Sequence, residues 1–115
     1  MPRDAYIIRS TPVTVPELVE AAAEVAPELT MRSLYDGVAV QFVDAEYRSV
    51  LTVQAGRTLS SGDEIRRLVP AAPLVAGPTW FAEAFIPWDD AEVGVEILTA
   101  VGMKWGATVI IEDGT

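Results

Sequence analysis

Three helix-start signals, separated by runs rich in β-branched and aromatic residues, set the strongest constraint on how this chain folds. Each signal is a Thr, Ser or Asp followed three residues later by Glu: Thr14 with Glu17, Ser61 with Glu64, and Asp89 with Glu92. Such pairs satisfy backbone N–H groups that the first turn of a helix leaves without partners. We therefore expect three helices, with strands before and after each of them.

The first of these helices has the fullest set of local signals. Pro16 falls in its first turn, where the missing N–H costs little, and Val13 and Leu18 occupy the two positions of a hydrophobic staple. Pro27 ends this helix, because the residue before a proline is disfavoured in the helical conformation. Gly106 is placed to cap the end of the third helix.

The expected strands are short runs in which β-forming residues predominate: residues 5–9, 29–35, 38–43, 47–54, 79–86 and 107–111. Asp36-Gly37 is a residue pair that two-residue type I′ turns prefer, so it joins the second and third runs as a hairpin. Asp44-Ala45-Glu46 then turns the chain into the fourth run. Residues 70–78 contain three prolines and predict an irregular connector.

The resulting order, β-α-β-β-β-α-β-α-β, predicts the α+β class and a single domain over residues 1–115. We expect a mixed, largely antiparallel sheet of five or six strands, with about three helices mainly on one face. Right-handed crossovers are expected where the strands on either side of a helix are parallel, and the antiparallel meander of the middle strands makes the sheet mixed.

The chain contains no cysteine and no histidine. This excludes thiolate nucleophiles, zinc fingers and iron–sulfur clusters, and it removes the commonest general base. No serine lies in a Gly-x-Ser-x-Gly pattern, and nothing links the sole lysine, Lys104, to a serine. The sequence therefore predicts no catalytic constellation, no metal site and no cofactor.

The formal charge of −9 comes from 17 acidic and 8 basic residues. Such a surface repels phosphate backbones and disfavours nucleic acid, whereas it attracts a basic protein. The alternative is that the acidity only keeps a small protein soluble.

The N-terminus lacks the pattern of a signal peptide, and prolines interrupt the longest uncharged stretch, residues 68–81. We therefore expect a cytoplasmic protein that does not contact membranes.

Four carboxylates gather where the third helix is expected to begin: Asp89, Asp90, Glu92 and Glu96. Oxygen ligands of this kind suit Mg²⁺ or Ca²⁺, but no calcium-binding loop can be written through them. Negative charge at a helix start also complements the helix dipole, and this simpler interpretation is favoured.

Glu83 and Trp88 are the two residues that folding alone explains least. Glu83 lies in the aromatic run 79–86, where burial would raise its pKa and suit it to acid–base chemistry; otherwise it is a solvated position or pairs with an arginine such as Arg48. Trp88 lies between Pro87 and two aspartates, which favours an exposed position. Trp80 and Trp105 suit either the core or an interface.

The leading functional hypothesis is a non-catalytic, acidic protein-binding module, an inhibitor or immunity-type protein that neutralises a basic toxin or enzyme. Its expected contact residues are Asp36, Asp44, Glu46, Trp88, Asp89, Asp90, Glu92 and Glu96. The alternatives are a small-molecule-binding or regulatory domain with a pocket under the proline-rich connector, a structural subunit of a larger assembly, and an enzyme centred on Glu83.

Overall fold

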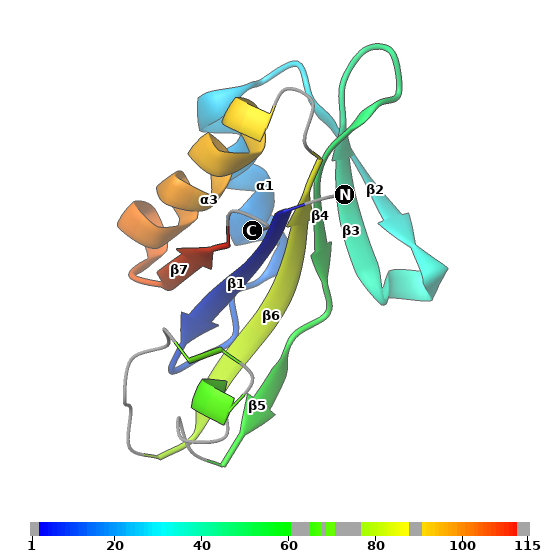
Figure 1. Ribbon diagram of the computed structural model, residues 1–115. Helices are drawn as coiled ribbons and strands as arrows, with labels where there is room; N and C mark the ends of the chain where they lie inside the picture. Colours follow the sequence, from blue (N-terminus) through cyan, green and yellow to red (C-terminus); the bar gives the residue numbers. More distant parts are fainter. Residues whose placement is uncertain (1–2, 61–64, 68, 71–76, 88–90, 113–115) are drawn as a thin grey trace.

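The computed structural model describes residues 3–60, 65–67, 69–70, 77–87 and 91–112, and its main element is a seven-stranded sheet (Figure 1). The strands are β1 (Arg3–Arg9), β2 (Thr30–Leu34), β3 (Ala39–Val43), β4 (Ser49–Gln54), β5 (Arg57–Leu59), β6 (Thr79–Ile86) and β7 (Thr108–Ile111). Their order is β2-β3-β4-β6-β1-β7, and β5 also pairs with β6. The helices are α1 (Val15–Val25) and α3 (Ala91–Trp105). Residues 65–67 are also helical.

The α+β class is confirmed, but the sheet differs in detail from the expected one. The strand β5 was not predicted, and every strand pairing that the structure describes is antiparallel, so the sheet is not mixed. Strands β6 and β7, which α3 joins, do run in the same direction. They are separated by β1, which pairs antiparallel with both, so they form a split β-α-β unit.

The start of α1 forms as its local signals predict. The Thr14 hydroxyl accepts a hydrogen bond from the Glu17 N–H, and the Glu17 carboxylate accepts one from the Thr14 N–H at 2.8 Å. Val13 and Leu18 are both buried. Gly106 follows α3 with a φ of 67°, the left-handed conformation expected of its cap. The signals at Ser61, Glu64 and Asp89 lie outside the described residues.

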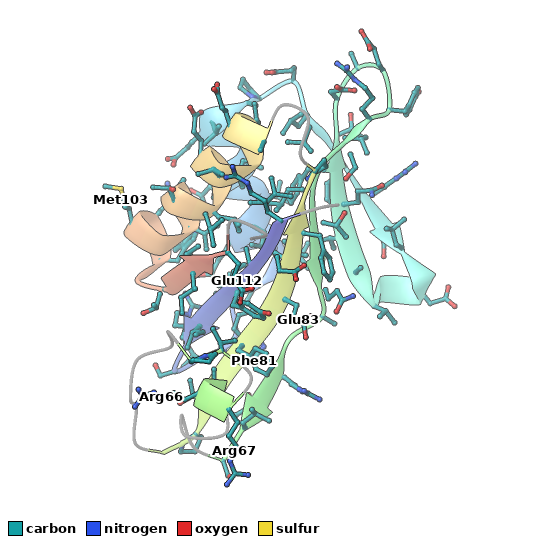
Figure 2. All side chains as sticks on the ribbon, in the orientation of Figure 1. Arg66, Arg67, Phe81, Glu83, Met103 and Glu112 are labelled. Atoms are coloured by element: carbon teal, nitrogen blue, oxygen red, sulfur yellow. The ribbon has the colours of Figure 1, made fainter. Side chains whose placement is uncertain are left out.

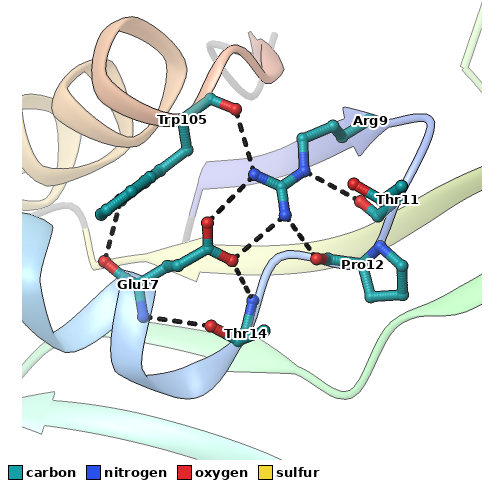
Figure 3. A network of polar contacts seen from close by, with 6 residues as sticks. All are labelled: Arg9, Thr11, Pro12, Thr14, Glu17 and Trp105. Atoms are coloured by element: carbon teal, nitrogen blue, oxygen red, sulfur yellow. Dashed lines mark hydrogen bonds and ion pairs between the residues drawn. The ribbon is translucent and has the colours of Figure 1, made fainter.

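The start of α1 is also tied to the end of β1 (Figure 3). The Arg9 guanidinium donates hydrogen bonds to both oxygens of the Glu17 carboxylate, to the Trp105 carbonyl and to the carbonyls of Thr11 and Pro12. The Trp105 indole N–H donates to the Glu17 carbonyl at 3.0 Å. One arginine thus joins a strand, the connecting loop and both helices.

The two turns around β3 behave differently. Asp36 and Gly37 have φ values of 55° and 91°, the positive values that a type I′ hairpin turn requires at both positions, so this prediction is confirmed. After β3 the register shifts between Phe42 and Val43, and β4 begins at Ser49 instead of residue 47. Tyr47 lies in the preceding turn with a φ of 61° and is 77% exposed.

The main core lies between the sheet and the two helices, which pack against each other on one face. Alternate residues of β1 and β6 supply the sheet side of this core: Ala5, Ile7, Ala82, Ala84 and Ile86. The helices supply Leu18, Ala21 and Ala22 from α1, and Ile97, Leu98 and Val101 from α3. In Figure 1 α1 lies behind β1 and β6, and α3 lies to their left, so the opposite face of the sheet is turned toward the reader.

A smaller apolar cluster covers one end of this opposite face. Ile8 and Phe81 pack there with Ile65 and Val69, which come from the segment between β5 and β6. The other end of the face is not covered by either described helix, and we call it the open end. It is formed by β6, β1 and β7, which bring residues from both ends of the chain together.

The described helices, of 11 and 15 residues, lack the length and apolar character needed to cross a lipid bilayer.

Candidate functional site

Side chains on the open end of the sheet form rows across β7, β1 and β6. In one row Asp4 lies opposite Phe85 in β6, and Glu112 follows β7 with its N–H donating to the Asp4 carbonyl at 2.8 Å. In the next row Tyr6 lies between Ile110 and Glu83. Because side chains alternate along a strand, both rows project from the same face. We call Asp4, Tyr6, Glu83, Phe85 and Glu112 the acid–aromatic patch.

The patch concentrates negative charge around an aromatic ring. Tyr6, Glu83 and Phe85 are half-buried, whereas Asp4 and Glu112 are exposed. The pKa of Tyr6 is raised above its usual value of 10.0, first by burial and then by the charges of Glu112, Asp4 and Glu83. Ionisation of the phenol would place another negative charge among three carboxylates, so the neutral phenol is favoured.

The carboxylates of the patch are not neutralised within the described part of the molecule. Among the described residues Asp4, Glu83 and Glu112 have no ion-pair partner. Like charges at directly opposite positions of neighbouring strands destabilise a sheet, and Asp4 and Glu112 occupy such positions. This arrangement weakens the fold, so the stability of the sheet does not explain it.

Positive charge lies at the other end of the same face. Arg57 in β5 places its guanidinium 5.4 Å from the centre of the Phe81 ring. Figure 2 shows Arg66 and Arg67 at this end, with Glu83 and Glu112 farther up the sheet. Both of these arginines are exposed. The face is therefore polarised along its strands, acidic at the open end and basic beside the small apolar cluster.

The β2–β4 part of the sheet satisfies its own polar groups. Arg32 donates to the Gln41 side chain at 2.8 Å, and Gln41 donates to the Thr52 hydroxyl at 3.2 Å. These residues lie opposite one another across β2, β3 and β4, in the row that also contains Phe85. The polar side chains of this row bond to one another, whereas the carboxylates of the acid–aromatic patch have no ion-pair partner among the described residues.

The structure does not gather the expected acidic contact residues in one place. Asp36 lies in the turn before β3, and Asp44 and Glu46 lie in the turn after it, so they occupy opposite ends of that strand. Asp44 accepts hydrogen bonds from the N–H groups of Arg48 and Glu46 and from the Arg48 guanidinium, and the Arg48 N–H contributes most to lowering the Asp44 pKa. Asp44 therefore shapes its turn.

Two of the remaining expected residues, Glu92 and Glu96, lie on α3. Glu92 and Glu96 are exposed in the first two turns of α3. The same part of α3 contacts the start of β4, because Gly94 packs against the Val50 carbonyl. Glu92 and Glu96 line a shallow pocket together with Arg3, whereas Asp44 and Glu46 pair with Arg48. Trp88, Asp89 and Asp90 lie outside the described residues.

Glu83 and the two described tryptophans also have definite positions. Glu83 is half-buried on the face of the sheet that α1 and α3 do not cover. Its suggested partner Arg48 lies in the β3–β4 turn and bonds to Asp44 and Glu46. Trp80 is buried in the main core, and Trp105 packs against that core with its N–H satisfied.

Sequence reasoning missed Asp4, Tyr6 and Glu112 as site residues. The alternation of polar and apolar residues along β1 does place Asp4 and Tyr6 on one face. Nothing in the sequence shows that β1 lies between β6 and β7, and this arrangement brings Glu83 and Glu112 to either side of Tyr6.

Within the described part of the chain, no group of three or more acidic residues is arranged to hold a metal ion. Comparison with protein-family models finds no match, and searches of curated proteins and of solved structures find no significant similarity.

Proposed function

We propose that this chain is a non-catalytic, acidic protein-binding module of the cytoplasm, whose partner is a basic protein that it inhibits or neutralises. The observation that carries the proposal is the acid–aromatic patch, where Asp4, Glu83 and Glu112 surround Tyr6 without ion-pair partners among the described residues. An arginine or lysine from a partner would relieve the repulsion between these carboxylates, so binding would recover stability that folding alone gives up.

The form of the patch also suits a protein partner. Tyr6, Phe85 and Ile110 provide partly exposed apolar surface. In protein–protein interfaces, aromatic residues beside charged groups are typical of the residues that contribute most of the binding energy. The net charge of −9 adds long-range attraction to a basic surface, which increases the association rate. The arginines at the other end of the face would fix the orientation of the bound partner.

The partner can be sought with the immobilised full chain at low ionic strength, followed by elution with salt. The purified partner is then tested by calorimetry at several salt concentrations. We expect affinity to fall steeply with ionic strength, because screening weakens attraction between exposed charges. Binding that is insensitive to salt would contradict the proposal.

Two double variants locate the contact. Asp4→Asn with Glu112→Gln removes two charges from the patch, and Glu92→Gln with Glu96→Gln removes two from α3. We expect the first pair to weaken binding by about tenfold or more and the second to have a smaller effect. The reverse result would assign the contact to the start of α3 and would leave the function itself in place.

A further inference from the structure

A cavity opens on the same face of the sheet where the partner of β6 changes from β4 to β5. The register of β4 with β6 ends at Val53 opposite Ala84, and the register of β5 with β6 begins at Arg57 opposite Phe81. Between these points, residues 54–56 face only two residues of β6. The extra residue makes the segment bulge, a feature that is frequent beside functional sites.

Two contacts hold the bulge in place. The Ala55 N–H donates to the Val38 carbonyl at 2.6 Å, so this residue bonds toward β3 and away from β6. Gly56 lies against the buried Trp80 indole so closely that a Cβ atom would be 2.2 Å from the ring. The backbone bulge that borders the cavity is therefore fixed by the fold.

The backbone of Glu83 is directed toward this gap. The Glu112 N–H donates to the Asp4 carbonyl, so Asp4 and, two residues on, Tyr6 direct their backbone groups toward β7. The residues of β1 whose backbone groups bond to β6 are therefore those that alternate with Asp4 and Tyr6, and Ile7 pairs with Ala82 in this way. It follows that the N–H and C=O of Glu83 point to the β4–β5 side of β6.

The cavity has a volume of about 210 Å³ and is lined by Gln54, Ala55, Arg57, Phe81, Ala82 and Glu83. Figure 2 labels Phe81 and Glu83, which bound it from β6. Arg57 and Glu83 both face the cavity, yet no ion pair joins them. The Arg57 guanidinium and the Glu83 carboxylate thus line the same small cavity without forming an ion pair.

We propose that this cavity binds a small zwitterion, a free α-amino acid. Arg57 offers the planar, two-donor geometry that carboxylates prefer, and its position over the Phe81 ring orients it. Glu83 accepts hydrogen bonds from the ligand's ammonium group. Sites for drug-sized molecules measure about 300–1,000 Å³, so the volume here suits a smaller ligand.

The test is an amide-resolved NMR titration of the full chain with glycine, L-alanine and L-leucine, and separately with acetate and methylammonium. We expect saturable shifts at Gln54, Arg57 and Glu83 with at least one amino acid, and weaker binding of acetate and methylammonium. Acetate binding as tightly as the amino acids would show a simple anion site and overturn the proposal. Absence of saturable shifts at millimolar concentrations would do the same.

Variants then assign the two charges. Arg57→Lys and Glu83→Gln should each raise the Kd by about tenfold, and the amide spectra verify that both remain folded. Arg32→Lys and Glu112→Gln, matched changes on the same face but outside the cavity, should leave the Kd unchanged. The two proposals fail separately, because Arg57→Lys leaves the acid–aromatic patch intact and Glu112→Gln leaves the cavity intact. A Kd unaffected by Arg57→Lys would overturn the zwitterion site alone.

Discussion

Arg9 and Glu17 form a two-bonded ion pair that joins the last residue of β1 to the first turn of α1. The two nitrogen–oxygen distances are 3.1 and 3.2 Å, and the side chains are 15% and 21% exposed. The same carboxylate accepts the Thr14 N–H as part of the capping box. These bonds lower the pKa of Glu17 from 4.5 to about 2, and the hydrogen bond from Arg9 contributes most to this shift. Two testable consequences follow from this pair.

The first consequence is a loss of stability in acid. Since the folded-state pKa of Glu17 lies below its unfolded value, the ionised carboxylate stabilises the fold above pH 4.5, and this contribution disappears as the pH falls from 4.5 to about 2. Glu17→Gln should cost about 2 kcal/mol at neutral pH and much less near the bottom of this range. Urea unfolding at both pH values measures the difference, with Glu96→Gln on α3 as the control. A cost of Glu17→Gln that is equal at both pH values would contradict the assignment.

The second consequence concerns the shape of the Arg9 side chain. Its guanidinium reaches carbonyls of Thr11, Pro12 and Trp105 as well as the Glu17 carboxylate. A lysine ammonium cannot bond to acceptors spread in this way, so Arg9→Lys should lower the free energy of unfolding by about 2–3 kcal/mol. Arg32→Lys, which affects an exposed arginine bonded to Gln41, is the matched control and should cost under about 0.5 kcal/mol. Equal effects of the two substitutions in urea unfolding would show that the network contributes little.

The sequence predicts those parts of the fold that depend on neighbouring residues. The capping box of Thr14 and Glu17, the hairpin turn at Asp36 and Gly37, and the limits of β6 were all predicted. Each is decided within a few residues, by the conformational limits of glycine and proline or by hydrogen bonds to the nearest turn. The short β5 lacks such signals, because it forms only by pairing with β6.

The sheet order and the candidate sites depend on contacts between distant parts of the chain. Asp4 and Glu112 come from opposite ends of the sequence and meet because β1 lies between β6 and β7. Alternation shows which residues share a face of a strand, but it does not show which strand is the neighbour. For the same reason Arg57 and Glu83 could not be placed on one cavity without the register of β5 against β6.

Gly94 provides a test of the packing between α3 and the sheet. Replacing a glycine inside a helix by alanine ordinarily stabilises it by about 1 kcal/mol. Here the new Cβ would lie 2.8 Å from the Val50 carbonyl oxygen and 2.9 Å from a methyl carbon of Ile86. Because α3 would have to move off the sheet, Gly94→Ala should instead destabilise the protein by about 1–3 kcal/mol. A rise in the urea midpoint would show that α3 does not pack this closely.

Tyr6 reports on the charges of the acid–aromatic patch without any partner. Its pKa is raised by burial and by the charges of Glu112, Asp4 and Glu83, so the folded protein keeps the phenol neutral above pH 10.0, where the unfolded chain ionises. This difference lowers stability as the pH rises through 10.0, and it adds nothing well below that value.

Glu112→Gln should therefore bring the Tyr6 pKa closer to its usual value, because it removes the largest of the three charge contributions. The ring signals of Tyr6, assigned by comparison with Tyr6→Phe, give this pKa in an NMR titration. Glu96→Gln removes the same charge from α3 and should leave the Tyr6 pKa unchanged. If the two variants shift it equally, Tyr6 responds only to the net charge of the protein, and the carboxylates do not surround it as the register of β7, β1 and β6 requires.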